Sequence, residues 1–179
     1  MESERLLLRK WEMNDAPALY SGLSNKEVAS DFGLKTPFTI EDAQRYIEDA
    51  IKKNKDKYAV VLKATNSVIG GCGIHNKQGK ISGSMWIAKE YQGNGFGTEA
   101  CMILVRHCFD TYDVKEMDNG FLEGNIASQR MQEKIGGVLL DKYSTSETSN
   151  GERKLIKMLL TKDSFDSIDN KHGVNNDIS

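Results

Sequence analysis

A glycine-rich run near the middle of the chain is the segment best suited to chemistry. It reads Tyr91-Gln92-Gly93-Asn94-Gly95-Phe96-Gly97-Thr98-Glu99-Ala100 and lies between a predicted strand and a predicted helix. Glycines let the backbone turn tightly and direct several N–H groups at one anion, and the start of a helix adds a positive dipole. These properties suit a diphosphate ligand. The alternative is a flexible turn with a helix-capping glycine.

Two common diphosphate-binding motifs do not fit this run. Counted from Gly93, a dinucleotide fingerprint requires a glycine where Thr98 stands, and a P-loop requires Gly-Lys followed by Ser or Thr. The pattern that remains is Gln92-x-x-Gly95-x-Gly97. A second pattern lies about thirty residues further on and reads Asn125-x-x-Ser128-x-Arg130-x-x-Glu133-Lys134-x-Gly136.

Both patterns resemble motifs of the GCN5-related N-acetyltransferase (GNAT) superfamily. The first resembles its pyrophosphate-binding motif, QxxGxG, and the second resembles the helix NxxSxRxxEKxG of its ribosomal-protein N-terminal acetyltransferase branch. The resemblance runs from about Glu4 to Leu160. It implies an α/β fold with a mixed, mostly antiparallel sheet of six or seven strands and flanking helices. Within this sheet the strand pair Ile81–Ile87 and Glu116–Leu122 would splay apart.

The resemblance also implies an activity and a set of site residues. The chain would transfer acetyl from acetyl-CoA, its co-substrate, to a primary amine by direct attack, without a metal or a covalent enzyme intermediate. Backbone N–H groups near Trp86 and Ile87 would polarise the thioester carbonyl. Asn125 would contact the pantetheine arm, and Ser128 would lie close to the sulfur. The pyrophosphate would be held by the loop residues Gln92, Gly93, Asn94, Gly95, Phe96, Gly97 and Thr98. Alternatives are that Trp86 belongs to the core and that Asn125 only caps a helix.

Three departures from the family pattern affect the choice of catalytic groups. Ser82 stands where the branch often has a carboxylate, and Gln132 aligns with the tyrosine that serves elsewhere as the general acid. Ser128 is therefore our candidate acid. Asp118, with Glu116 beside it, is our candidate base, although both also fit solvated strand positions. Gly137 replaces a common aromatic residue. A non-catalytic acyl-CoA-binding sensor remains the alternative function.

Two of the histidines and the three cysteines are given no catalytic role. We interpret His75 and His107 as structural, the former at the end of a predicted strand near a hairpin, without an identified partner, and the latter on an apolar helix stripe. The cysteines form no CxxC pair and are interpreted as reduced core thiols, namely Cys72, Cys101 and Cys108.

Hydrophobic periodicity and turn signals predict the elements that position these residues. Asn14 and Thr39 are expected to cap helices, the latter in a capping box with Asp42. We expect residues 1–162 to form one N-acetyltransferase domain and 163–179 a polar, disordered tail. The predicted strands are Glu4–Lys10, Tyr58–Ala64, Val68–His75, Ile81–Ile87, Glu116–Leu122, Val138–Tyr143 and Arg153–Leu160, and a polar loop, Ser144–Gly151, separates the last two.

The composition of the chain limits the kinds of partner that the protein is expected to bind. The 179 residues carry a formal net charge of -2, so we expect no binding to nucleic acid or anionic lipid. Apolar runs are shorter than the roughly 20 residues of a membrane span, and the first residues do not resemble a signal peptide. We therefore expect a cytoplasmic enzyme whose amine acceptor is a protein N-terminus or a small molecule. A homodimer remains open.

Overall fold

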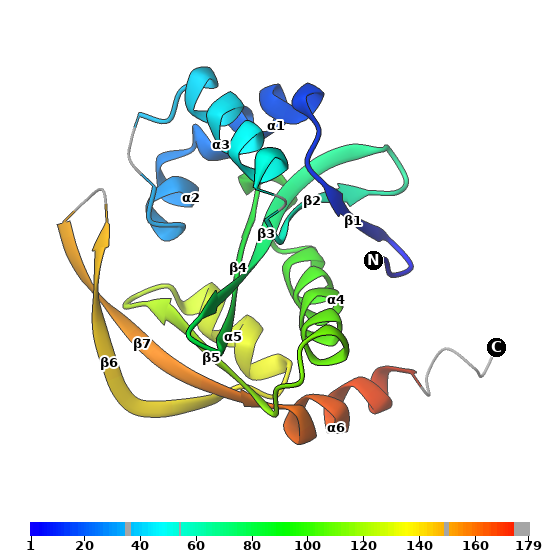
Figure 1. Cartoon of the computed structure of the whole chain (residues 1–179), viewed down its shortest axis with the longest axis vertical. Helices are drawn as coiled ribbons and strands as arrows, with labels where there is room; N and C mark the ends of the chain where they lie inside the picture. The colour runs from blue at the N-terminus through cyan, green and yellow to red at the C-terminus, as the bar shows by residue number, and fades with distance from the viewer. Residues whose placement is uncertain (35–36, 54, 149–150, 174–179) are drawn as a thin grey trace.

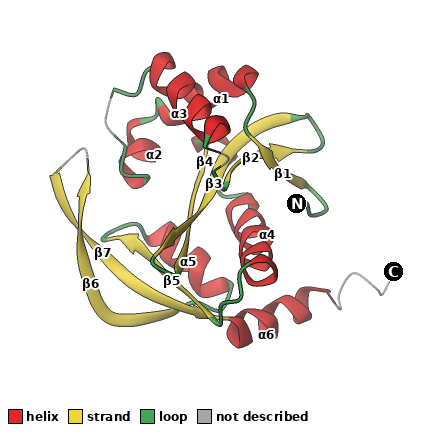
Figure 2. Cartoon of the chain, viewed as in Figure 1, coloured by secondary structure: helices red, strands yellow, loops and turns green. Residues whose placement is uncertain are grey.

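The structure, a computed structural model, describes residues 1–34, 37–53, 55–148 and 151–173 and consists of two antiparallel sheets with flanking helices (Figures 1 and 2). The first sheet has the order β1-β2-β3-β4 and the second the order β5-β7-β6. The strands are β1 (Leu6–Lys10), β2 (Lys57–Leu62), β3 (Ser67–Lys77), β4 (Lys80–Ile87), β5 (Glu116–Leu122), β6 (Val138–Thr148) and β7 (Gly151–Thr161). The mixed α/β fold and the seven strands confirm the predicted fold class.

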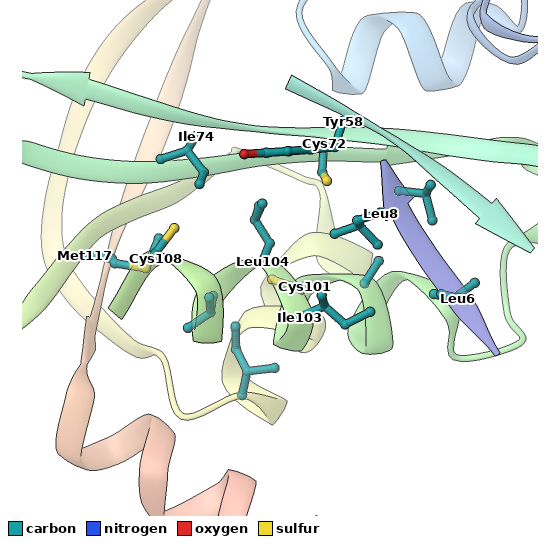
Figure 3. Close-up of a cluster of buried hydrophobic side chains, with 14 of the residues drawn as sticks. Leu6, Leu8, Tyr58, Cys72, Ile74, Cys101, Ile103, Leu104, Cys108 and Met117 are labelled. Carbon is teal, nitrogen blue, oxygen red and sulfur yellow. The ribbon is translucent and has the colours of Figure 1, made fainter. Parts of the chain in front are cut away.

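Helices cover both faces of the first sheet. On one face lie α1, α2 and α3, which pack with Trp11, Ala59, Val61 and Trp86 into one hydrophobic cluster. On the other face lies α4, and Figure 3 shows Leu104 and Ile103 of this helix beneath Leu8, Cys72 and Ile74 of the sheet. The helices are η1 (Met13–Asp15), α1 (Ala16–Leu23), α2 (Lys26–Asp31), α3 (Ile40–Lys52), η2 (Lys89–Tyr91), α4 (Phe96–Thr111), α5 (Ile126–Lys134) and α6 (Lys162–Gly173).

The two sheets meet at β4 and β5, which lie next to each other without a backbone ladder between them. One side chain bridges the gap, because the Asn119 Oδ1 on β5 accepts a hydrogen bond of 3.0 Å from the Gly83 N–H on β4. Beyond this bridge the strands separate. The predicted splayed pair is therefore confirmed, and its opening leaves β4 backbone groups free to meet a ligand.

The helix starts show one correct prediction and one wrong one. Thr39 and Asp42 form the expected capping box at the start of α3. Asn14 is not a helix cap, because it lies inside η1. The Asp15 carboxylate accepts a hydrogen bond of 2.9 Å from the Glu12 N–H and closes the capping box of η1, and α1 begins directly after Asp15. The sequence analysis also missed α2, a helix of 6 residues that Asn25 caps. With only about one and a half turns, this helix is too short to show a hydrophobic period.

The expected polar loop Ser144–Gly151 is wrong for its described residues. β6 continues to Thr148 and pairs with β7 through Ser144↔Leu155 and Thr148↔Gly151. Residues 149–150 lie outside the described part. The long β6–β7 ribbon exposes much of both faces, so its sequence lacks the apolar-polar alternation by which a strand is recognised.

The expected disordered tail is also wrong, as far as the structure describes it. Residues Lys162–Gly173 form α6, and Phe165 is only 1% exposed in the main core. Its ring lies 5.9 Å from the Phe109 ring of α4, centroid to centroid. A single buried aromatic residue in a polar segment gives no periodic signal. Residues 174–179 lie outside the described part, and the domain limit at 162 stays a prediction.

Candidate active site

A cavity of about 850 Å³ lies where the two sheets separate. Its wall consists of residues from β4, β5, the glycine-rich loop, the first turn of α4, and α5. It extends past the face of the first sheet to α2 and to Ser146 and Leu155 on the β6–β7 ribbon. One space therefore connects the glycine-rich loop, the gap between the sheets, α2 and the β6–β7 ribbon.

The glycine-rich loop adopts a backbone conformation that requires its glycines. Gly93 and Gly95 both have φ of 80°, in the left-handed region. Gly95 directly precedes α4, so the unpaired N–H groups of the first turn follow it, and Gly97 and Thr98 line the cavity. The arrangement offers an anion several N–H donors and the positive end of a 16-residue helix.

Two side chains of the loop form hydrogen bonds that hold the loop itself. The Gln92 Nε2 donates to the Ile87 carbonyl oxygen at 2.9 Å, which anchors the loop to the end of β4. The Asn94 amide donates to the carbonyl oxygens of Tyr91 and Gln92 at 3.2 and 3.1 Å. Gln92 and Gly93 still line the cavity, whereas Asn94 and Phe96 lie outside the wall that the described residues form.

A contact from the first strand, which the sequence analysis missed, holds the start of α4. The Arg5 Nε donates to the Glu99 carboxylate at 2.7 Å, and the Ser3 hydroxyl donates to the same group at 2.7 Å. Burial alone would raise the pKa of Glu99, but these hydrogen bonds outweigh it, so the pKa is lowered. The Arg5 guanidinium also lies 4.6 Å from the centre of the Phe96 ring, which explains why Phe96 points away from the cavity.

The register of β4 determines which of its N–H groups face the gap. The Gly83 N–H points to β5, while the Ala88 N–H donates to Ile69 on β3 at 2.9 Å. Because N–H groups alternate in direction along a strand, those of Met85 and Ile87 also point toward the gap and that of Trp86 points to β3. Near Trp86, the N–H groups that face the gap are thus those of Met85 and Ile87, and the expected contact with the thioester stays a prediction. The Trp86 side chain is 5% exposed, as expected for core, and still lines the cavity.

The second motif forms the start of α5 on the far side of the gap. The Asn125 Oδ1 accepts from the Ser128 N–H at 3.0 Å, so Asn125 does cap this helix, and both residues line the cavity. The Gln132 Nε2 donates to the Gly120 carbonyl oxygen at 3.0 Å and to the Ser128 Oγ at 3.2 Å. Because the Ser128 hydroxyl accepts a bond from Gln132, its own proton is free to point at another acceptor.

The structure does not bring Asp118 to the cavity. Its neighbours Met117 and Asn119 line the wall, and side chains alternate along a strand, so Asp118 lies on the opposite face of β5. There its carboxylate lies 3.6 Å from the Lys157 Nζ, with 41% of the side chain exposed. The geometry therefore does not support Asp118 as the base, and Glu116 shares its face.

Two carboxylates that reach the cavity come from α2. Glu27 and Asp31 are four residues apart on this helix, and both line the wall. Glu27 pairs with Lys89 at 2.7 Å. Burial raises the pKa of Asp31 above its ordinary value. Asn25, an N-cap residue one position before Lys26, was the only signal in the sequence that could have revealed this helix.

The cysteines have the properties of core thiols. All three are free and buried. Burial raises the pKa of Cys101 to about 12 and that of Cys108 to about 12, so thiolates are scarce at neutral pH. Among the described residues, no three His, Cys, Asp or Glu side chains come together in a group that could hold a metal ion. None of the helices in the described part is long and apolar enough to span a membrane.

The sequence model of the acetyltransferase (GNAT) domain matches residues 5–138 of the chain. The chain belongs to this family. Family membership confirms the acetyltransferase activity and the acetyl-CoA co-substrate that the two motifs predicted. An N-acetyltransferase of Bacillus licheniformis, p20, is 29% identical over 166 residues, which is 80% of this chain and 93% of that protein.

Solved structures of acetyltransferases share the fold over about nine-tenths of this chain. A candidate ribosomal-protein-serine acetyltransferase from Vibrio cholerae superposes with a TM-score of 0.73 at 18% identity, covering 89% of this chain and 95% of the other. Spermidine N-acetyltransferase from Vibrio cholerae, in complex with CoA and spermine, superposes with a TM-score of 0.76 at 17% identity, covering 91% and 99%. At sequence identities this low, the structural similarity is evidence for the fold alone.

Proposed function

We propose that this GNAT enzyme acetylates a primary amine of a peptide N-terminus or a small molecule by direct attack on acetyl-CoA. The observation that carries the proposal is the continuous cavity, which joins the glycine-rich loop and the gap between β4 and β5 to the acidic wall of α2. A long, anionic co-substrate suits the first two regions. An amine, which is cationic before it loses its proton, suits the third.

In this proposal each part of the cavity has one task. The loop from Gln92 to Thr98 and the start of α4 bind the pyrophosphate, and Asn125 contacts the pantetheine arm. The N–H groups of Met85 and Ile87 donate to the thioester carbonyl oxygen, which gains negative charge as the amine attacks. The Ser128 hydroxyl, which Gln132 orients, donates a hydrogen bond to the leaving sulfur.

The acceptor class follows from the cost of neutralising the amine. At pH 7 a lysine amine with a pKa of about 10.4 loses its proton at a cost of roughly 4.6 kcal/mol, against about 1 kcal/mol for an α-amine near 7.8. Ser82 replaces the carboxylate that relatives often have, and Asp118 faces away from the cavity. A site without a strong base favours the α-amine of a peptide. The Vibrio cholerae ribosomal-protein-serine enzyme supports this choice, whereas the spermidine enzyme supports a small polyamine.

One experiment tests the activity and the acceptor together. Thiol release from acetyl-CoA is measured with a peptide whose lysines are blocked, the same peptide with its α-amine blocked, spermidine and an aminoglycoside. We expect release above the hydrolytic background, with the highest kcat/KM for the free α-amine. Faster acetylation of the lysine peptide would overturn the preference. Tight CoA binding without release for any amine would favour the sensor. Whether the enzyme forms a homodimer stays a prediction, which sedimentation can test.

A further inference from the structure

His75 and Ser84 form a hydrogen-bonded pair on the wall of the cavity. Both residues line it, and the His75 Nε2 lies 2.8 Å from the Ser84 Oγ. They belong to adjacent strands, since His75 stands opposite Ser82 and Gly73 opposite Ser84 in the β3–β4 register. Opposed residues share a face and every second residue returns to it, so both side chains lie on the face of Trp86.

This position brings the pair close to the reacting groups. Ser84 directly precedes Met85, whose N–H faces the gap. Ser84 and Ile87 are three residues apart, which is about 10 Å along a strand, and both line the same cavity as Met85. It also lies on the side of the first sheet that α2 and α3 cover, which is the side on which the acceptor is proposed to bind.

The surroundings of the imidazole favour its neutral form. Desolvation first, and then the positive charges of Lys57 and Lys77, lower the pKa of His75 below its ordinary value. Lys57 stands opposite Gly73 on β2, and its Nζ lies 3.7 Å from the centre of the Tyr46 ring of α3. The wall also carries Glu27 and Asp31 of α2 and Lys89, which pairs with Glu27 at 2.7 Å. Arg130 and Lys134 of α5 are its remaining charged residues in the described part.

Gly73 leaves room for this arrangement. A Cβ at this position would lie 3.5 Å from the Lys57 Cγ and 3.6 Å from the Ser84 Oγ. The nearest atom to it would be the Asp56 carbonyl oxygen at 3.2 Å. A larger residue at this position would therefore crowd the Lys57 and Ser84 side chains.

We propose that Ser84 and His75 form the proton relay of the transfer, a role that rests on the proposed function. The amine nitrogen attacks the thioester carbon, so a C–N bond forms and the C–S bond breaks. The nitrogen loses a proton to the Ser84 Oγ while the Ser84 hydroxyl proton passes to the His75 Nε2. The sulfur leaves as the CoA thiolate, which solvent later protonates, and the imidazolium returns its proton to solvent.

The relay also explains the proposed acceptor. An ammonium must lose one proton before the nitrogen can attack, and the relay would pass this proton to solvent before it takes the second proton during the attack. A neutral imidazole with a lowered pKa is a weak base, so it removes the first proton from an α-ammonium of pKa about 7.8 far more readily than from a lysine ammonium of about 10.4. Ser84 would be the group that contacts the acceptor. His75 would act through Ser84 and hold the hydroxyl in place.

The test compares the pH dependence of kcat in three enzymes, with a tetrapeptide amide bearing a free N-terminal serine as the acceptor. His75→Gln keeps a side-chain amide near the Nε2 position but cannot take up a proton. We expect kcat at about pH 7.5 to fall at least tenfold, and the loss to shrink toward acid pH, where the wild-type imidazole is already protonated. His107→Gln is the matched control, because this α4 histidine contacts Thr111 and lies outside the described cavity wall.

The other readouts separate the relay from a structural role. The Kd for CoA should stay within about twofold of wild type in His75→Gln, because the loop is untouched. Ser84→Ala should lower kcat by a similar factor, which keeps the proposal testable if the histidine variant folds poorly. An unchanged kcat in both variants, or an equal loss at every pH, would overturn the relay. Failure of the wild type to acetylate any amine would overturn the proposed function instead.

Discussion

At the glycine-rich loop, a single backbone conformation limits which residues can stand beside the cofactor. Gly95 has φ of 80°, and the nearest atom to an added Cβ would be the Arg5 Nη2 at 3.6 Å. Space is therefore available, and the obstacles to another residue are backbone strain and charge. Strain of this kind costs about 1–2 kcal/mol.

Gly95→Asp should weaken CoA binding by about 10- to 100-fold, because it places a negative charge where the pyrophosphate is proposed to lie. Isothermal titration calorimetry with CoA gives the affinity. The control is Gly79→Asp, which carries the same strain at φ of 82° on the β3–β4 turn with no atom within 4 Å of its Cβ. Equal affinity in the two folded variants would remove the loop from the binding site.

Ser128 offers a second test at this scale. Its hydroxyl is oriented by Gln132 at 3.2 Å and is proposed to stabilise the leaving thiolate. Ser128→Ala should lower kcat by about tenfold while the Kd for acetyl-CoA changes little, since the interaction strengthens only as negative charge develops on sulfur. Single-turnover kinetics isolates the chemical step. A chemical rate equal to that of wild type would leave Ser128 as a structural residue.

At the scale of elements, α1 and β3 make room for the Trp86 ring that forms part of the cavity wall. A Cβ at Gly22 of α1 would lie 2.3 Å from the Trp86 Cζ3, and one at Gly71 of β3 would lie 2.7 Å from its Nε1. Two glycines on different elements thus permit one large side chain to lie between helix and sheet. Packing around the Trp86 ring therefore links the stability of α1 to the shape of the cavity wall on the side where the acceptor is proposed to bind.

Gly22→Ala should lower the free energy of unfolding by about 1–2 kcal/mol, although alanine favours helix by about 1 kcal/mol over glycine. The clash with Trp86 outweighs that gain, and urea unfolding measures the balance. Gly97→Ala is the comparison, because its Cβ would find ordinary contacts at 3.7 and 3.8 Å and should leave stability unchanged or higher. A more stable Gly22→Ala protein would show that Trp86 moves without cost.

The contact of α6 with α4 gives a second prediction for the elements. Phe165 is fully enclosed, and the Asp169 carboxylate accepts from the Arg106 Nε at 3.0 Å. Phe165→Ala should cost about 3–5 kcal/mol, since it removes a buried aromatic ring and leaves a cavity. Chemical denaturation checks this against Asn170→Ala on the exposed side of α6, which should cost less than about 0.5 kcal/mol. A loss below about 1 kcal/mol at Phe165 would mean that α6 detaches easily.

Over the whole molecule, one nearly buried ion pair ties stability to acid pH. The Arg9 guanidinium donates to both oxygens of Asp15 at 2.7 and 2.8 Å, and Asp15 is 7% exposed. Burial alone would raise the pKa of Asp15, but the bonds from Arg9 and from the Glu12 N–H outweigh it, so the pKa is lowered. The resulting stability is present above the unfolded pKa of about 3.9 and is lost as the pH falls through the lower folded pKa.

Asp15→Asn should therefore reduce the free energy of unfolding by about 2 kcal/mol at neutral pH, with the difference from wild type narrowing below about pH 4. Urea unfolding across this range measures both effects. Glu12→Gln is the control, because Glu12 lies 3.9 Å from the same Arg9 with 65% of its side chain exposed and should change stability by under about 0.5 kcal/mol. A constant difference down to about pH 3 would contradict the assigned pKa direction.

The sequence by itself determined those features of this protein that depend only on residues close together in the chain. The glycine-rich run at Gln92-x-x-Gly95-x-Gly97 predicted a tight loop, in which Gly95 has positive φ, and Thr39 with Asp42 predicted a capped helix. β5 was predicted with its observed bounds, Glu116–Leu122. Such features follow from backbone sterics and short-range hydrogen bonds, which neighbouring residues decide.

Only the tertiary structure decided which side chains reach the cavity. A one-residue difference in strand position moves a side chain to the opposite face of the sheet, and this is why Asp118 lies on the face away from the cavity. Long-range packing brought α2 with Asp31, the Ser84–His75 pair and Phe165 of α6 into their places. No periodic pattern marks these positions, because each depends on the register of two strands or on a contact between elements far apart in the chain.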